Sequence, residues 1–163
     1  MRESRIRFIR QLGFATPTDD LYSALMLQPR IVGVLAALGI LTQSPLVFLG
    51  LSAALLWGAL VPTQNSFDAI YNHVVAHRRG LPPLTTSPAP RRFAMSMAGG
   101  VALAIGIALL AGTTMVATLI EALLAVAVMA VVFGDSCAGA NLYHVLRRRL
   151  TTEASRASEA IRH

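Results

Sequence analysis

The chain has 163 residues, of which 55% are hydrophobic and 13% are charged, whereas an ordinary soluble domain is about 25% charged. Its apolar residues are concentrated in long runs, which excludes an ordinary water-soluble domain and indicates a lipid environment. The formal net charge is +6, and the basic residues are fourteen arginines with no lysine. Because apolar runs flank these arginines, we expect anionic lipid headgroups as their partner and no nucleic acid. The single cysteine excludes an intrachain disulfide.

The arginines predict how the chain crosses the membrane. They occupy residues 2–30, 78–92 and 147–162, and four apolar stretches lie between these segments in two pairs. Short cytoplasmic segments of membrane proteins retain basic residues. We therefore predict an all-α integral membrane four-helix bundle, built from two transmembrane hairpins with interfacial amphipathic helices. Both termini would lie in the cytoplasm and the hairpin tips outside, in a bacterial inner membrane.

Residues 1–28 are predicted to form a basic amphipathic segment at the cytoplasmic surface. The pattern of residues 1–12 favours a helix lying in the membrane interface. Its apolar residues are Ile6, Phe8, Ile9 and Leu12. Thr16 would cap a second, short helix over residues 19–28, with Pro17 at its first position.

The first hairpin covers residues 29–61. Pro29 opens its first apolar stretch, residues 31–41, which is short for a span because crossing a bilayer takes about 20 residues. Residues 42–45 predict a tight turn, and the second stretch follows over residues 46–61.

A polar middle segment, residues 62–92, connects the hairpins. The apolar spacing over residues 65–79 is typical of an amphipathic helix. After it, the prolines at positions 82, 83, 88 and 90 preclude regular helix and predict a stiff, extended connection.

The second hairpin covers residues 93–146. Its first stretch spans residues 93–111 and its second spans residues 115–133. We expect the last helix to continue unbroken to about Leu150. A basic cytoplasmic tail, residues 147–163, follows.

Two ridges of small residues run along the second and third apolar stretches. They consist of Gly50, Ala54 and Gly58, and of Gly100, Ala104 and Ala108. Small residues four apart let helix backbones approach closely in lipid. The ridges predict either packing within the bundle or a docking face for another membrane subunit.

Glu121 lies inside the fourth stretch, about two turns from its external end. An ionisable group in a membrane is a functional hypothesis by default, so this carboxylate is a candidate proton or ion ligand. The alternative is a structural role in which Glu121 is hydrogen-bonded to Thr114, Thr118 or an external partner. No other stretch supplies an acid or base at this level, which argues against a transporter.

The densest polar patch spans residues 133–144. In one interpretation it is a tightly packed helix end in which Asp135, a second membrane carboxylate, pairs with Arg91 or Arg92. In the other, Cys137 is a reactive thiol, which requires a basic neighbour or a helix N-terminus. Because the chain has no second cysteine, such chemistry would need a partner protein.

His73 and His77 are four residues apart on the predicted middle helix, a spacing that can bind a metal. Cys137 and His144 are expected on the same side of the membrane, so a composite site is geometrically open to them. A single histidine also suffices to ligate haem. The simpler interpretation is that the histidines lie near lipid headgroups. We predict no catalytic residue, no metal and no cofactor, although haem, a pigment or a lipid stays open.

Seven further arginines are expected to contact lipid headgroups or a partner protein, because guanidinium binds phosphate in a bidentate way. They are Arg78, Arg79, Arg91, Arg92, Arg147, Arg148 and Arg149.

The motif Arg91-Arg-Phe-Ala94, together with Phe133-Gly-x-x-Cys137-x-Gly139-x-x-Leu142-Tyr143, resembles a family of small bacterial four-helix integral membrane proteins. The resemblance covers residues 28–146, and the family is classified only as a domain of unknown function. It implies the fold and no settled activity. Family members often carry a second cysteine in the last motif, where this chain has Ala138 or Ala140, and this departure weakens a dithiol role.

Three functions are therefore expected in order. The first is a non-catalytic membrane subunit that docks on and stabilises a larger energy-transducing or transport complex. The second is a redox-linked membrane protein that acts through Cys137 with a partner. The third is a binder of haem, pigment or metal through His73, His77 or His144.

Overall fold

The computed structural model describes residues 2–81 and 83–161, and within them the side chains of all but residues 79 and 154–161. These residues form helices and no strand, which confirms the predicted all-α class. In chain order the helices are α1 (Glu3–Gln11), α2 (Asp19–Thr42), α3 (Pro45–Leu60), η1 (Pro62–Gln64), α4 (Ser66–Ile70), η2 (Tyr71–Ala76), α5 (His77–Arg79), α6 (Ala89–Leu110), α7 (Thr114–Gly134) and α8 (Ala138–Ile161).

Three of the described helices, α2, α6 and α7, are long and apolar enough to cross a membrane. The fourth apolar helix, α3, has 16 residues, about 24 Å at 1.5 Å per residue, against a hydrocarbon core of about 30 Å. The apolar helices indicate a membrane-embedded protein.

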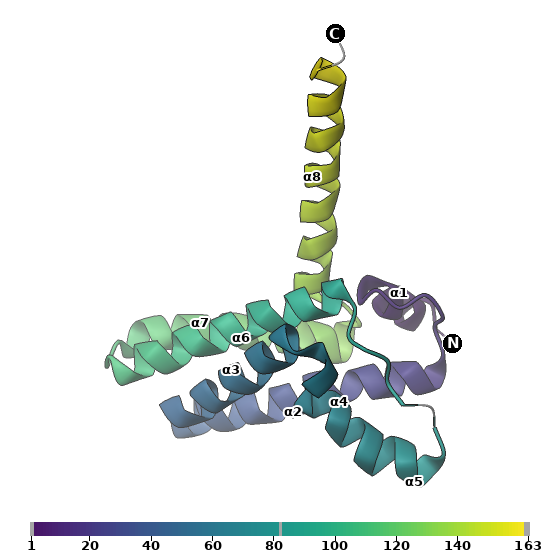
Figure 1. The fold of residues 1–163 in the computed structure, drawn as a ribbon. Helices are drawn as coiled ribbons and strands as arrows, with labels where there is room; N and C mark the ends of the chain where they lie inside the picture. Colours follow the sequence, from purple (N-terminus) through teal and green to yellow (C-terminus); the bar gives the residue numbers. More distant parts are fainter. Residues whose placement is uncertain (1, 82, 162–163) are drawn as a thin grey trace.

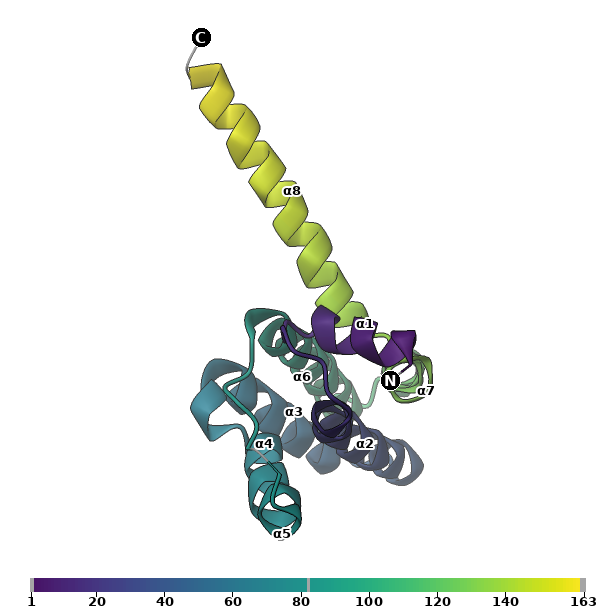
Figure 2. The same ribbon diagram turned by 90° about the vertical axis from the view of Figure 1, so that its right-hand side faces the viewer.

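The four apolar helices lie side by side along one direction (Figure 1). Both hairpin turns, at residues 43–44 and 111–113, lie at one end of this bundle, which we call the tip end. Helices α1, α4, α5 and α8 gather at the opposite end, which we call the basic end (Figure 2). The core runs along the bundle, with α6 packed against α3, α7 and α8.

The first hairpin begins earlier than its hydrophobicity indicates. Thr18, rather than Thr16, caps α2 by accepting a hydrogen bond from the Leu21 amide at 3.2 Å. The expected break at Pro29 is absent, because α2 runs through this proline as one helix of 24 residues. Buried Leu25 and Val32 hold the helix on either side of it. The predicted tight turn is confirmed, since α3 starts at Pro45.

The expected continuous last helix is wrong. Helix α7 ends at Gly134, and Asp135 adopts a left-handed conformation with φ of 49°. The chain turns sharply through residues 135–137, and α8 then leaves the bundle across the direction of the spans (Figures 1 and 2). The sequence Gly-Asp-Ser is a turn signal that the surrounding hydrophobicity obscured.

The predicted interfacial helices place much of their apolar surface in the protein. Phe8 and Ile9 of α1 are fully buried against Leu25 and Met26 of α2 and Ala140 of α8. Helix α1 therefore covers the basic end instead of lying in lipid.

The middle helix buries one side against the protein and exposes the other. Phe67 and Tyr71 are buried, while Ile70 and Val74 are exposed. Its central six residues form a π-helix, η2, which changes the expected spacing of side chains.

Two neighbouring glycines of α6 provide a matched test of the packing. A Cβ on Gly99 would lie 2.8 Å from Cγ of Leu56, whereas a Cβ on Gly100 would meet nothing within 4 Å. Both alanine substitutions gain the same helix propensity, but overpacking costs about 1–3 kcal/mol. We expect Gly99→Ala to be less stable than Gly100→Ala by that amount, measured by thermal unfolding in detergent. Equal stabilities would contradict the α3–α6 interface.

Candidate functional site

Arg91, at the start of α6, forms a buried ion pair with Asp68 of α4. Its exposed fraction is 4% and that of Asp68 is 8%. Nη2 donates to Oδ1 of Asp68 at 2.6 Å and Nη1 donates to Oδ2 at 3.1 Å. This bidentate geometry is the strongest form of an arginine–carboxylate contact, and the pair fastens the middle segment to the second hairpin.

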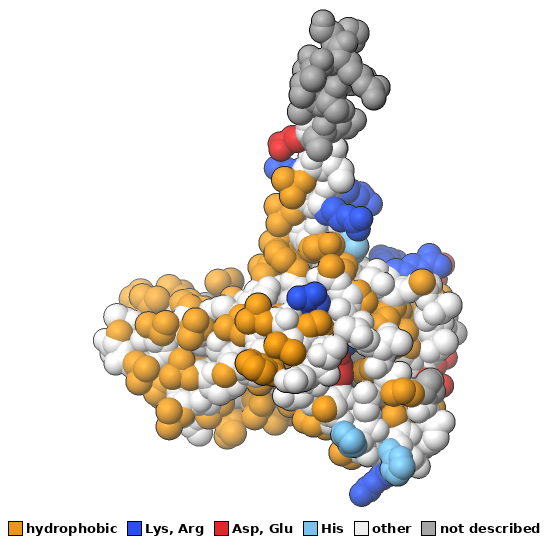
Figure 3. Space-filling model, viewed as in Figure 1, with side chains coloured by type: hydrophobic (Ala, Val, Ile, Leu, Met, Phe, Trp, Pro, Cys, Tyr) orange, Lys and Arg blue, Asp and Glu red, His pale blue; other side chains and the backbone are white. Residues whose placement is uncertain are grey.

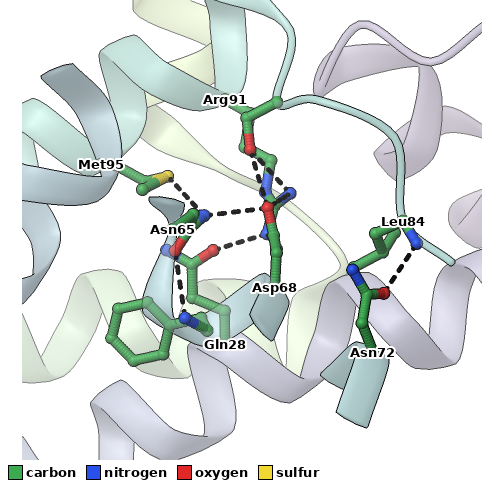
Figure 4. A network of polar contacts seen from close by, with 9 residues as sticks. Gln28, Asn65, Asp68, Asn72, Leu84, Arg91 and Met95 are labelled. Carbon is green, nitrogen blue, oxygen red and sulfur yellow. Dashed lines mark hydrogen bonds and ion pairs between the residues drawn. The ribbon is translucent and has the colours of Figure 1, made fainter. Parts of the chain in front are cut away.

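Three further side chains, those of Gln28, Asn65 and Ser87, join Asp68 and Arg91 in what we call the inner network. Figure 4 shows this network and labels its residues except Ser87. Gln28 of α2 accepts a bond from Arg91 Nη2 at 2.8 Å, and Ser87 accepts one from Nη1 at 2.9 Å. Asn65 Nδ2 donates to Oδ2 of Asp68 at 3.0 Å. The network thus joins α2, the middle segment and α6 at the basic end.

The predicted pairing of Asp135 with Arg91 or Arg92 is wrong, and Arg91 does not reach lipid headgroups. The guanidinium of Arg91 is already paired with the carboxylate of Asp68. The Nε atom of Arg92 donates to the carbonyl of Ala59 at 2.8 Å, near the end of α3. Arg92 therefore satisfies a helix-end carbonyl that lacks an intrahelical partner.

Asp135 instead fastens α1 and α2 to the turn between α7 and α8. Its carboxylate accepts hydrogen bonds from Ser4 Oγ at 2.8 Å and from the Tyr22 hydroxyl at 2.5 Å. The guanidinium of Arg5 lies 4.6 Å from the centre of the Tyr22 ring, which adds a cation–π contact. Both bonds hold the carboxylate in place as a structural acceptor.

Cys137 and His144 are held by α1 and do not form a site together. The amide of Cys137 donates to the side-chain oxygen of Gln11 at 3.4 Å, and His144 Nε2 donates to the Gln11 carbonyl at 2.9 Å. Burial raises the pKa of the Cys137 thiol above its ordinary value of 9.0. The thiol is therefore mostly protonated at neutral pH, the opposite of what a reactive cysteine requires.

Glu121 is buried at the tip end and has a partner that sequence reasoning missed. The side-chain amide of Gln43 donates to its carboxylate oxygens at 3.3 and 3.1 Å. Gln43 is the left-handed residue of the first hairpin turn. The threonine pairing does not form, since Thr118 donates to the Thr114 carbonyl. Glu121 thus links the two hairpins.

His73 and His77 are exposed on η2 and α5, away from Cys137 and His144. Within the described part of the chain, no group of three or more histidine, cysteine or acidic side chains is arranged to hold a metal ion. The composite metal site is not assembled in this arrangement.

Half of the small residues on the predicted ridges serve the internal packing. Gly58 and Ala108 are buried and half-buried Ala54 packs against the core, but Gly50, Gly100 and Ala104 are exposed. Besides Gly58, whose Cβ would lie 2.7 Å from Cε of Met95, the bundle's close approaches use Gly99 and Gly106 of α6 against leucines of α3, and Gly139 of α8 against Ala94.

Most of the remaining arginines lie on the surface at the basic end. A groove of about 830 Å³ between α1 and α8 is lined by Arg7, Arg10 and Arg148 among other residues. Arg78, Arg147 and Arg149 are also exposed, while the side chain of Arg79 lies outside the described residues.

An apolar cavity of about 320 Å³ lies beside the inner network, lined by residues of α1, α2, α3, α6, α7 and the start of α8. Gln28, Arg91 and Cys137 border it, and the other lining groups are apolar. The cavity has room for an apolar group, and Cys137 contributes the one thiol to its lining.

The important polar residues missed by sequence reasoning are Gln28, Gln43, Asn65, Asp68 and Ser87. Each pairs with a residue far along the chain or lies in the middle segment, where polar residues are expected on the surface. Two local signals were available. Asn65 caps α4 and lies three residues before its partner Asp68, and Ser87 and Arg91 are four residues apart across a helix start. Their bond of 2.9 Å depends on this spacing.

The geometry defines a membrane-embedded, all-helical protein whose buried polar groups are bonded within the chain. Among the described residues, no buried side-chain nitrogen or oxygen lacks a hydrogen-bond partner. The chain belongs to the family of the domain of unknown function DUF4395, whose model matches residues 24–148. Comparisons with the curated proteins and with the solved structures found no match.

Removal of Asp68 tests the inner network. Asp68→Ala would leave the Arg91 charge buried without a partner, and breaking a buried pair in this way costs about 3–5 kcal/mol. We expect a loss of this size in the free energy of unfolding. The matched control is Asp19→Ala, which breaks the exposed pair with Arg5, whose side chains are 64% and 40% exposed, at a cost of about 0–1 kcal/mol. Similar losses in the two variants would contradict the network.

The raised pKa of Cys137 predicts slow alkylation with an alkaline midpoint. Because the thiolate is the nucleophile, the rate of reaction with iodoacetamide should be half-maximal above pH 9.0. The control is Thr151→Cys in a Cys137→Ala background, which places the thiol at an exposed position. A midpoint for Cys137 at or below that of the control would contradict this account, since limited access alone lowers the rate without moving the midpoint.

Proposed function

We propose that the protein is a non-catalytic integral membrane subunit that docks on and stabilises a larger membrane complex of the energy-transducing or transport kind. In this proposal α3 completes a four-span bundle. The basic end faces the cytoplasm of a bacterial cell, because short cytoplasmic segments retain arginine.

The observation that carries the proposal is the outward position of the small-residue surface on α3 and α6. A Cβ built on Gly50 or Gly100 meets nothing within 4 Å, and Ala104, one turn after Gly100 on α6, is exposed. The chain's own helices do not use these positions. Small residues on an open helix face allow the backbone of another membrane helix to approach closely, which fits a docking surface.

The fate of the ionisable groups also supports a non-catalytic role. Asp68, Glu121 and Asp135 accept hydrogen bonds within the chain, and burial favours the protonated thiol of Cys137. Acid–base and nucleophilic catalysis require a group that is free to exchange a proton or to attack. These three carboxylates hold the helices together instead.

Leucine substitutions at the two open glycines test the docking surface. We expect Gly50→Leu and Gly100→Leu to keep the thermal stability of the wild type, since each added side chain enters open space. Both should lose the partner subunits that co-purify with the wild type from native membranes in mild detergent, as detected by native mass spectrometry. The matched control is Ala37→Leu on an exposed position of α2, which should retain them.

Two outcomes would contradict the proposal. One is a wild-type protein extracted only as a monodisperse monomer. The other is equal partner retention by the glycine variants and the Ala37→Leu control.

A further inference from the structure

Helix α8 leaves the bundle along the plane that a membrane surface would occupy. The spans α2, α6 and α7 set the direction of the membrane normal. Figure 1 shows α8 running across this direction from the basic end, and Figure 2, turned by 90°, shows it extending sideways beyond the bundle. A helix placed in this way lies parallel to the bilayer at the level where the spans end.

The first half of α8 carries an exposed apolar stripe. The stripe consists of Leu142, Val145, Leu146 and Leu150, spaced at the three- and four-residue intervals that put side chains on one helix face. Leu150, at the end of the stripe, is 66% exposed. Figure 3 shows apolar side chains along the side of α8 that faces the tip end, which is the side where lipid would lie.

The stripe continues the lipid-facing surface of α7. Phe133, at the end of α7, is 76% exposed, and Met129 one turn earlier is also exposed. Leu142 follows one turn into α8, so exposed apolar groups border both sides of the turn at residues 135–137. One apolar surface therefore extends from a spanning helix onto α8.

Charge on the remaining faces of α8 matches an anionic membrane surface. Arg147 and Arg148 are exposed and, at 100° per residue, lie away from the centre of the stripe. Arg149 and Glu153, four residues apart, lie on the same face of α8 as the stripe. The stripe is therefore confined to the first half of the helix. Guanidinium groups at this depth reach headgroup phosphates, and basic residues near an anionic surface are attracted to it.

We propose that α8 lies on the membrane surface, with the apolar stripe inserted among acyl chains and Arg147 and Arg148 bound to anionic phospholipid headgroups. This proposal is independent of any partner subunit. It explains why an amphipathic helix extends beyond the protein core, because the bilayer covers the face that the bundle leaves open.

Spin labels on opposite faces of α8 test the proposal in the full chain. In a Cys137→Ala background, labels are placed at Leu146→Cys on the stripe and at Thr151→Cys on the other face. The protein is reconstituted alone in nanodiscs of phosphatidylcholine and phosphatidylglycerol. We expect position 146 to be more accessible to oxygen than to a water-soluble nickel chelate, and position 151 to show the reverse.

Equal accessibility of the two positions to the nickel chelate would overturn the proposal, as would protection of position 146 only after native membrane proteins are added. With Arg147→Gln and Arg148→Gln, the label at position 146 should become shallower, and an unchanged depth would overturn the headgroup contact.

A second set of variants keeps Cys137 and carries Leu146→Trp or Thr151→Trp in a Trp57→Phe background. Brominated lipid should quench the first tryptophan several-fold more strongly, and equal quenching would overturn the proposal.

Discussion

The ion pair between Arg91 and Asp68 is the interaction on which the arrangement of the basic end depends. A charge removed from water must be neutralised and fully hydrogen-bonded, and here Gln28 and Ser87 complete the shell around the guanidinium. These partners come from α2, α4 and the connection before α6. Satisfying one buried arginine therefore fixes the middle segment against both hairpins, and the extended proline-containing connection acquires a defined path.

The same logic recurs at two other levels of the bundle. Asp135 joins α1 and α2 to the turn before α8, and Gln43 joins the first hairpin turn to Glu121 of α7. Hydrogen bonds between polar side chains thus hold together apolar helices whose packing alone does not specify one arrangement. What is left for contacts with other molecules is the outer surface, namely the open small-residue face of α3 and α6, the arginines of the basic end and the apolar stripe of α8.

Local chemistry determined which features were predictable from sequence. The hairpin turn at Gln43–Pro45 and the apolar helices follow from turn residues and hydrophobic length, so they were predicted. The pairing of Arg91 was not, because Asp68 lies 23 residues away and becomes its neighbour only after the helices assemble. The break predicted at Pro29 is absent because packing on both sides of a proline can hold a helix together. At Asp135 the error was the opposite one. A continuous helix was predicted where α7 ends, because the surrounding hydrophobic residues concealed the left-handed turn.

The Arg91 charge is bound inside the protein and not to lipid. Solid-state NMR on the protein in phospholipid bilayers distinguishes these two arrangements directly, through dipolar couplings of the Arg91 guanidinium nitrogens. We expect strong coupling to the carboxyl carbon of Asp68, lost in Asp68→Ala, and no coupling to lipid phosphorus. Coupling of Arg91 to phosphorus in the wild-type protein, without coupling to Asp68, would contradict this expectation.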